Sequence, residues 1–553
     1  MPELKRFIVM MALLGAGPAL AQDFQSPQFT VSKVDWDAAA RSVAAAPANV
    51  PGEIFAALNK TVAPRFAGID RSSVPVLLPM DVAAYRSDLE AGAADANNSN
   101  KYFGDFTPSK FFLAGPAGYD ATFWINPKDA GLTFSWPKPV EVQIGGAAFV
   151  YDLADPNSQE VFAPPKELAA KFPGMQRVLR ENHVRYVFER FGVPYVVMIQ
   201  CYDRRPSRRF LACREADQVA QRFLDRLQTA GGSPQPIDEP KFDLSRPVKE
   251  SEDFTYYGPG DLIENSGWKK LPGRADYNVY ARIRYPIAAA PSYIKSQSFM
   301  SWGDCYRTGR VGRLGKDATY RCKLNDRPLV FNEAAAENWT YPWRDNFCER
   351  RDFLVGQCPG GYGHQGEDIR PANCVVRDAN SDRCLPYQHT VAAAHDGLIW
   401  RTAGDLGTYI VWNSGNDHVR VRYLHMNPNM MDADGLLSGR IVSEGEIIGK
   451  VADWGDHERG TSYHLHFNMQ VFTQVGWVWV NPYTTLIAAY ERLIAARGKE
   501  IKPGDPPPPV PAKLPVILPP SAIAESSATP VKHVASKPEP AKKRRHGRHG
   551  RKH

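Results

Sequence analysis

The amino-acid sequence predicts an α+β domain, then a mainly antiparallel β domain, and finally a disordered tail rich in proline and basic residues. The first half mixes runs of β-branched residues with one segment of helical periodicity. The second half contains short segments in which apolar and polar residues alternate, the pattern of half-buried strands. The end of the chain is dominated first by proline and then by lysine and arginine, a composition that does not form a packed core.

Residues 1–21 have the three parts of a secretory signal peptide. Lys5 and Arg6 form the charged end, residues 7–17 form the apolar run, and Ala19-Leu20-Ala21 is a small-residue cleavage site. The apolar run is too short for a membrane anchor, which needs about 20 residues. We therefore expect an exported protein, periplasmic or extracellular, with no transmembrane segment once the signal is removed.

The first domain is expected over residues 53–235, after an Ala-, Pro- and Ser-rich linker over residues 22–52. Its β-branched content predicts strands at 74–78, 140–144 and 193–199. Apolar residues at helical spacing predict a helix over 216–230, which Gly231-Gly232 would end. No catalytic constellation is visible in this half.

A second linker is expected over residues 236–276, where prolines recur. The β domain follows over residues 277–496, with alternating segments at 398–412, 419–424 and 463–471 and a closing helix at 485–496. Residues 497–553 are the predicted disordered tail.

The positive charge of the chain is concentrated in that tail. Residues 532–553 contain 9 Lys and Arg residues and one Glu, a net charge of +8, whereas the whole chain carries +7. Such a tail either docks on an anionic envelope polymer or simply keeps the protein soluble. An exported protein is not expected to bind nucleic acid.

All eight cysteines lie beyond the signal, and they group as sequence neighbours. Short loops close readily and export implies an oxidising compartment, so we expect local disulfides. The expected pairs are Cys201–Cys213, Cys305–Cys322, Cys348–Cys358 and Cys374–Cys384. Cysteine zinc ligands are the competing interpretation, which the lack of any Cys-x-x-Cys spacing disfavours.

Two short stretches carry the chemistry. His364 and Asp368 are four residues apart, and His464-Leu465-His466 follows about a hundred residues later. Successive side chains of a strand point to opposite faces, so His464 and His466 share one face. His364, Asp368 and His466 form a three-ligand set for zinc with a fourth position open for water. Lone histidines such as His418 are expected to have no metal role.

Three motifs follow one another in the chain: His-x-Gly-x-Asp at His364-Gln365-Gly366-Glu367-Asp368, then Tyr423-Leu424-His425, then His464-Leu465-His466. This order resembles that of the lysostaphin-type (LytM-like) zinc metalloendopeptidases. The resemblance covers roughly residues 280–490. It is strengthened by the glycine-containing turns at 390–397 and 442–449. The first half of the chain lies outside it.

The resemblance implies one Zn²⁺ per chain, held by His364, Asp368 and His466, with His425 and His464 as catalytic histidines. It also implies that the substrate is the peptide cross-link of bacterial peptidoglycan and that zinc-bound water attacks the scissile amide. Which catalytic histidine is the base stays open.

Further side chains are expected near this site. Asn468 lies on the face of His466, and Tyr423 belongs to the Tyr-Leu-His motif, so both are expected to orient a ligand or touch substrate. Two insertions, at 302–357 and 371–389, are expected to wall the substrate groove. Trp343, Tyr362 and Tyr387 are their candidate substrate contacts.

Two other functions fit the sequence. A LytM-like module can lack catalysis and activate another wall hydrolase, but such modules generally lack metal ligands, whereas all five positions are filled here. A secreted general protease is the second alternative. For the first domain, wall binding, a latency domain over the active site and a plain scaffold all remain open.

Overall fold

A computed structural model describes most of the chain between residues 23 and 506. The described residues are 23–43, 50–93, 100–134, 136–153, 160–202, 211–296, 323–324, 327–328, 333–378, 380–401, 407–414, 417–455, 457–502 and 505–506. The predicted signal peptide, residues 507–553 of the predicted tail, and Cys305 and Cys322 lie outside them. Within the described part, no helix combines the length and the apolar character needed to cross a bilayer.

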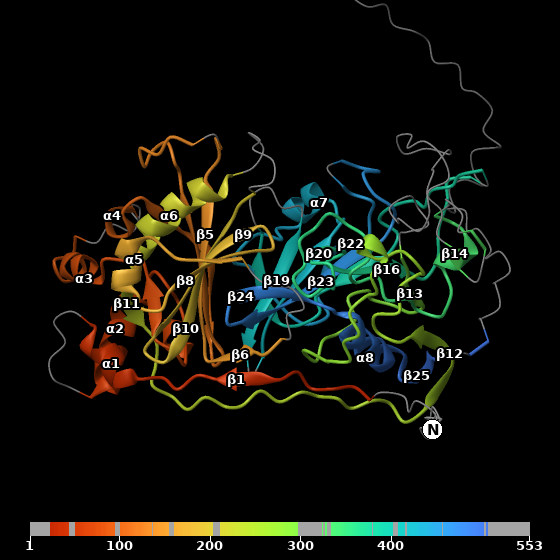
Figure 1. Cartoon of the computed structure of the whole chain (residues 1–553), viewed down its shortest axis with the longest axis horizontal. Coiled ribbons are helices and arrows are strands. Elements are labelled where there is room, and N and C mark those ends of the chain that lie inside the picture. Colours follow the sequence, from red (N-terminus) through yellow and green to blue (C-terminus); the bar gives the residue numbers. More distant parts are fainter. Residues whose placement is uncertain are drawn as a thin grey trace, which may run out of the picture.

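The first half is built on a seven-stranded antiparallel sheet. Its strands, in spatial order, are β3 (Phe106–Gly115), β4 (Gly118–Ile125), β5 (Val140–Ala147), β10 (Val193–Gln200), β9 (His183–Arg190), β8 (Gln176–Arg180) and β7 (Glu160–Phe162). The helices are α1 (Trp36–Arg41), α2 (Pro51–Val62), α3 (Val82–Glu90), α4 (Asn100–Phe103), α5 (Lys166–Lys171) and α6 (Cys213–Asp225). They lie on the side of this sheet away from the second half (Figure 1).

Two local predictions in this half differ from the structure. The helix predicted over 216–230 ends at Asp225, because residues 228–231 form strand β11 (Gln228–Gly231), which pairs with β2 (Val76–Leu78). The linker predicted over 22–52 contains α1, capped by the Asp35 side chain, and β1 (Phe29–Val31), which pairs with β6 (Phe149–Tyr151). These strand pairings join segments that are far apart in the chain, so no local sequence pattern predicts them.

The second half is mainly antiparallel β, as predicted. Its large sheet has the order β13 (Ser292–Ile294), β16 (Gly366–Pro371), β23 (Leu465–Thr473), β20 (Asp417–Leu424), β19 (Thr408–Ser414), β18 (Gly397–Trp400) and β21 (Ile441–Val442), and β24 (Gly476–Val480) also pairs with β23. The antiparallel pair of β17 (Thr390–Ala392) and β22 (Ile447–Lys450) and the helices α7 (Pro428–Ala433) and α8 (Tyr483–Ile494) complete this half. The short strands β14 (Lys323–Leu324) and β15 (Arg327–Pro328) pair with each other in the first insertion, residues 302–357.

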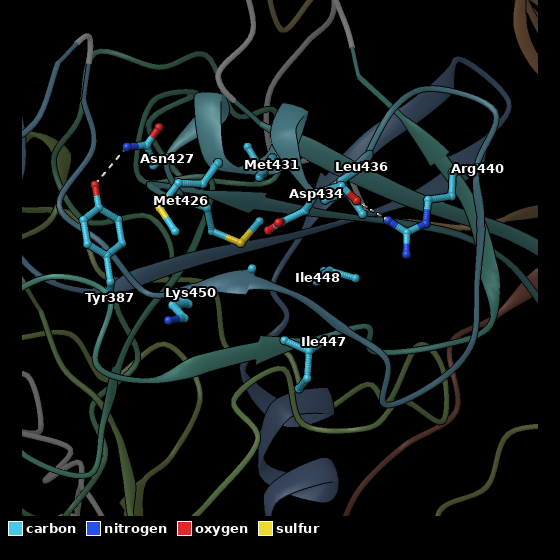
Figure 2. Close-up of a pocket in the computed structure, with 12 residues that line it drawn as sticks. Tyr387, Met426, Asn427, Met431, Asp434, Leu436, Arg440, Ile447, Ile448 and Lys450 are labelled. Carbon is cyan, nitrogen blue, oxygen red and sulfur yellow. Dashed lines mark hydrogen bonds between the residues drawn. The ribbon is translucent and has the colours of Figure 1, made fainter.

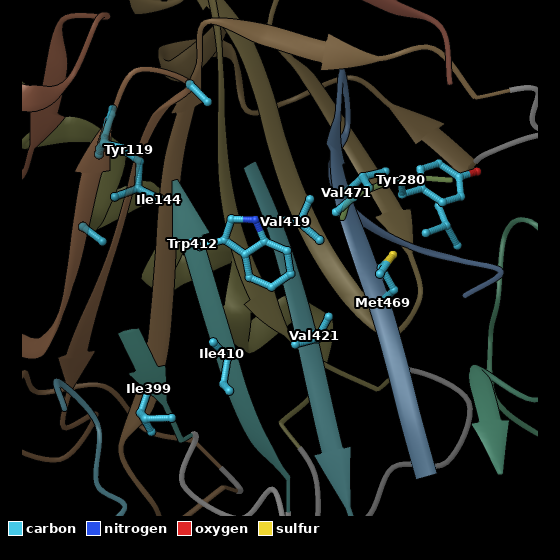
Figure 3. Packing of buried hydrophobic residues seen from close by; sticks show 14 of the residues in the cluster. Tyr119, Ile144, Tyr280, Ile399, Ile410, Trp412, Val419, Val421, Met469 and Val471 are labelled. Atoms are coloured by element: carbon cyan, nitrogen blue, oxygen red, sulfur yellow. The ribbon is translucent and has the colours of Figure 1, made fainter. Parts of the chain in front are cut away.

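One face of this sheet is an apolar layer. Val421 on β20 lies opposite Met469 on β23, and Ile410 on β19 lies opposite Val421, so these side chains share a face (Figure 3). All three are fully buried. Because neighbours along a strand alternate, the intervening residues of β20 and β23 point to the other face, which carries the polar site described below.

The two halves meet on that other face. Asp120 on β4 accepts hydrogen bonds from His418 and Arg420 on β20 and from Trp477 on β24. An apolar cluster that includes Met198 on β10 surrounds the contact. The first sheet therefore covers one end of the polar face, and Figure 1 shows β24 next to this sheet, where β24 contacts β10.

The second linker and the start of the predicted tail also contain regular structure. β12 (Glu250–Tyr257) pairs in parallel with β25 (Arg497–Ile501). Arg246 donates to both carboxylate oxygens of Glu491 on α8. The segment predicted as a linker is thus fastened to the end of the β domain.

Candidate metal centre

Strand register brings the predicted ligands together. On β16 and β23, Asp368 lies directly opposite His466, so both side chains leave the sheet on the same face. His364 lies two residues before β16, and His464 forms an isolated bridge with Ala452 just before β23. His425 follows the last residue of β20, with a left-handed φ of 71° that a non-glycine residue adopts only where its surroundings require it. All five predicted side chains converge on one spot.

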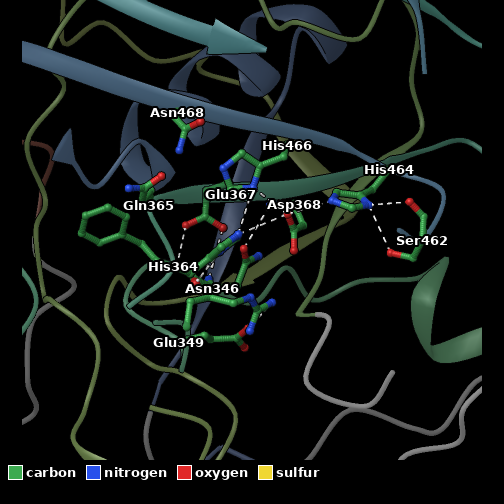
Figure 4. A network of polar contacts seen from close by, with 12 residues as sticks. Asn346, Glu349, His364, Gln365, Glu367, Asp368, Ser462, His464, His466 and Asn468 are labelled. Atoms are coloured by element: carbon green, nitrogen blue, oxygen red, sulfur yellow. Dashed lines mark hydrogen bonds and ion pairs between the residues drawn. The ribbon is translucent and has the colours of Figure 1, made fainter. Parts of the chain in front are cut away.

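Three acceptor atoms form the centre of this cluster. His364 Nε2 lies 2.9 Å from His466 Nδ1. Asp368 Oδ1 lies 3.0 Å from His466 Nδ1 and 3.3 Å from His364 Nε2 (Figure 4). Ligands held about 2.0–2.2 Å from a tetrahedral zinc ion are about 3.3 Å apart, which is close to these separations.

In three of the four histidines, a backbone carbonyl fixes the ring nitrogen Nδ1. His364 Nδ1 donates to Asn346 at 2.9 Å, His464 Nδ1 to Ser462 at 2.8 Å, and His425 Nδ1 to the carbonyl of Trp454 at 2.7 Å. A carbonyl can only accept, so in each ring Nε2 carries the lone pair. Such contacts orient metal ligands and set their tautomer.

Burial and proximity set the charges in the cluster. Burial alone would raise the pKa of Asp368, but the adjacent His364 and His464 imidazoles outweigh it and hold this pKa well below its usual range. Burial and the neighbouring His364 lower the pKa of His466 to about 3. Burial also lowers the pKa of His364. A carboxylate and two neutral imidazoles are the forms that bind a metal ion.

The donor set fits a divalent cation. Two imidazole nitrogens and a carboxylate oxygen lie within 3.3 Å of one another, so they can hold either a shared proton or a cation between them. Within the described residues, Asp368 Oδ2 is buried and has no hydrogen-bond partner. Two nitrogens and one oxygen suit zinc better than calcium or magnesium, which prefer oxygen ligands.

His425 and His464 lie beside this triangle. Their ring centroids are 4.6 Å apart, and His464 Nε2 is 3.2 Å from Asp368 Oδ1. His425, His464 and His466 also converge closely enough to hold an ion, so two triads share His466. Geometry brings the histidines together, and their division into ligands and catalysts stays a prediction.

A disulfide-closed loop supports the position of His364. Cys348 and Cys358 are bonded, and the backbone of His364 donates to the carbonyl of Glu349 and accepts from Cys348 N–H. A Cβ on Gly363 would lie 2.7 Å from Cys348 Cα, so only glycine allows this approach. Bonds Cys201–Cys213 and Cys374–Cys384 are also present, and no described cysteine is free.

The two predicted supporting residues lie on opposite faces. Asn468 shares the face of His466, and its Oδ1 accepts from Arg422 Nε at 3.0 Å. Tyr423 instead points into the apolar layer, because it lies opposite Phe467 rather than His466. Its hydroxyl accepts the N–H of Ala394 at 2.8 Å. Tyr423 is therefore buried on the face opposite to the metal ligands, and its predicted role in orienting a ligand or touching substrate stays a prediction.

The three aromatic residues predicted to contact substrate lie in different surroundings. Trp343 is fully buried and donates to the carbonyl of Ser292, so it belongs to the core. Tyr362 stacks near Trp268, with centroids 4.9 Å apart. Tyr387 lines a pocket of about 140 Å³ next to Met426, the residue after His425 (Figure 2).

That pocket was not predicted. Its lining combines apolar and polar side chains, and Tyr387 and Asn427 in it are joined by a 2.9 Å hydrogen bond. The apolar side chains are those of Met426, Met430, Met431, Leu436, Ile447 and Ile448, and the other polar ones are those of Asp434, Arg440 and Lys450. Its residues come from α7, β22 and the second insertion, three segments that the sequence pattern does not connect. Asn346 was missed for the same reason, although it contacts both His364 and Asp368.

Comparisons with known proteins add little to this site. No family model matches the chain. No curated protein matches it. A solved structure named as a LytM glycyl-glycine endopeptidase from Ruminococcus gnavus matches with 22% identity and a TM-score of 0.18. That match covers 25% of this chain and about half, 52%, of the other.

Proposed function

We propose that the chain is an exported zinc metalloendopeptidase that hydrolyses peptide cross-links of bacterial peptidoglycan. One observation carries the proposal: a buried triangle of His364, Asp368 and His466 acceptor atoms lies beside two further imidazoles. A purely structural zinc site closes with four protein ligands, whereas a catalytic site keeps a position open. The substrate class comes from the resemblance of the motifs to the lysostaphin-type peptidases.

The three ligands would bind one Zn²⁺ per chain. Zinc in such a site supplies Lewis-acid chemistry toward a peptide carbonyl and water. Asn346 positions two of the ligands, since its carbonyl accepts from His364 and its side-chain oxygen accepts the N–H of Asp368 at 3.0 Å. The ligand geometry therefore depends on Asn346, which lies two residues before the loop that Cys348 and Cys358 close.

His425 and His464 would move the proton. Each presents Nε2 as an acceptor, because a carbonyl holds its Nδ1–H. Burial, together with His464 and His466, lowers the pKa of His425 well below its usual range, so its free ring is neutral and can accept a proton from water. Once protonated, either ring can donate to the departing amine or to the carbonyl oxygen, a contact typically worth about 2.7–4 kcal/mol.

The three disulfides support export, since such bonds persist in oxidising compartments. We propose a periplasmic or extracellular location for this reason and because of the signal-like residues 1–21. The basic segment 532–553 would hold the enzyme on an anionic envelope polymer.

Digestion of purified sacculi tests the function. The zinc-loaded protein should release peptides whose masses correspond to cut cross-links, and a chelator should stop the release until zinc is restored. Intact cross-links together with cleavage of an unfolded protein substrate would favour a general protease. Intact cross-links with stimulation of another hydrolase would favour the activating module.

A further inference from the structure

A guanidinium group lies on the same sheet face as the metal ligands. Arg422 on β20 is directly opposite Asn468 on β23, and Asn468 is two residues from His466. Residues two apart on a strand are about 7 Å apart and project from the same face. Arg422 is partly exposed, whereas Tyr423 and Val421 beside it are buried in the apolar layer.

Several contacts fix this guanidinium. Arg422 donates from Nε to Asn468 Oδ1 at 3.0 Å, from Nη2 to Gln365 Oε1 at 3.0 Å and from Nη1 to the Tyr409 hydroxyl at 3.3 Å. Its Cζ lies 4.6 Å from the centre of the Trp479 ring. A planar group held by hydrogen bonds and an aromatic face loses little freedom on binding a further acceptor.

The surroundings of Arg422 strengthen the attraction of its guanidinium for an anion. Tyr409 and Trp479 belong to a buried apolar cluster that also contains Phe111 of the first half and the Cys348–Cys358 disulfide. Low-dielectric walls increase the attraction between a cation and an anion. Gln365, which follows ligand His364, is partly exposed and neutral, so a carboxylate can replace its oxygen on Nη2 as the stronger acceptor.

We propose that Arg422 binds a carboxylate of the substrate peptide, on the residue next to the scissile amide. The inference rests on the proposed peptidase function. Successive Cα atoms of a peptide are about 3.8 Å apart. Asn468, which holds the Arg422 guanidinium, is about 7 Å along the strand from His466, and this spacing, less the reach of a hydrogen bond, corresponds to about one residue. The carboxylate is either the terminal one of the peptide or one on a side chain, and both present the same two oxygens to Arg422.

Matched soluble peptides test the proposal. A peptide taken from the cleavage sites found in sacculi is synthesised with its carboxylates free, with only the terminal carboxylate amidated, or with only the side-chain carboxylate amidated. For the wild-type enzyme, kcat/KM should fall roughly 10- to 100-fold on amidation of one of them, the usual effect of losing a hydrogen bond to a charged group. The affected form identifies the source of the carboxylate.

In Arg422→Gln the ratio of kcat/KM between the free and amidated peptides should approach one. Arg222→Gln is the matched control, because Arg222 is a surface residue paired with Asp105 on the first half, and it should keep the wild-type ratio. Arg422→Lys keeps the charge but not the planar fork, so it should keep an intermediate ratio, which remains measurable if the glutamine variant does not fold.

The outcomes separate the two proposals. If the zinc-loaded enzyme cuts no peptide, the peptidase function fails. If wild-type enzyme cuts the free and both amidated peptides equally, or Arg422→Gln keeps the full ratio, the peptidase stands and the role of Arg422 is refuted.

Discussion

Replacing Asp120 with alanine should strongly destabilise the junction between the two halves. Asp120 Oδ2 accepts from His418 Nε2 at 2.6 Å, and Oδ1 accepts from Arg420 Nη2 and Trp477 Nε1, both at 2.9 Å. Each of these four side chains is buried. The substitution leaves the Arg420 guanidinium charged and without this carboxylate in a site from which water is excluded.

The free energy of unfolding should fall by about 3–5 kcal/mol, the usual cost of removing one partner of a buried ion pair. Urea unfolding followed by tryptophan fluorescence measures it, because Trp477 lies on the cluster. Asp105→Ala is the control, since the Arg222–Asp105 pair is exposed and should be worth no more than about 1 kcal/mol. A loss in Asp120→Ala as small as that in the control would refute the reasoning.

The stability that Asp120 contributes should depend on pH. Burial alone would raise the pKa of Asp120, but His418 and Arg420 outweigh it and lower this pKa in the folded protein. The contribution of the Asp120 carboxylate to the free energy of unfolding is therefore present above the unfolded-state pKa of about 3.9. It is lost as pH falls through the lower pKa of the folded protein. The stability difference between wild type and Asp120→Ala should shrink below about pH 4, and a difference that grows on acidification would contradict this.

Three further predictions concern other parts of the chain. Gly366→Ala should lower both stability and zinc content, because its Cβ would lie 2.2 Å from a carbonyl oxygen of the opposite strand, whereas Gly52→Ala has open space and should leave zinc unchanged; equal zinc in the two variants would refute this. Truncation at Lys532 should weaken retention on sacculi at low salt only, since screening acts within about 8–10 Å, and should not alter turnover of a soluble peptide; unchanged low-salt retention would mark the tail as a solubility segment. Peptide mapping of the exported, unreduced protein should link Cys305 to Cys322, and a free thiol at either would contradict local pairing.

The shared face of His464 and His466 could be predicted from sequence because that information is local. The grouping of this pair with His364, which is 102 residues from His466, followed from the order of the motifs and their resemblance to a known family. A spacing of two places His464 and His466 on one face in any strand. The face on which Tyr423 lies could not be predicted in this way, because it depends on the register between β20 and β23. Arg422 was missed because its role depends on that register too.

Contacts between distant segments could not be predicted. The pairing of β12 with β25 joins residues about 240 positions apart, and no sequence pattern in either segment predicts which strand it pairs with. Asp120 and His418 are separated by 298 residues, so their ion pair depends entirely on how the two sheets pack. The structure places His418, a lone histidine in the sequence, in this buried pair.

The zinc content of two strand neighbours tests the central claim most directly. His466→Ala leaves only His364 and Asp368, too few ligands for a stable site, so zinc per chain should fall sharply. His464→Ala keeps all three proposed ligands and should retain about one zinc while losing about 10²–10⁴ in activity, and His425→Ala should behave in the same way. Full zinc in His466→Ala, or equal zinc loss in all three variants, would contradict the assignment of ligands and catalysts.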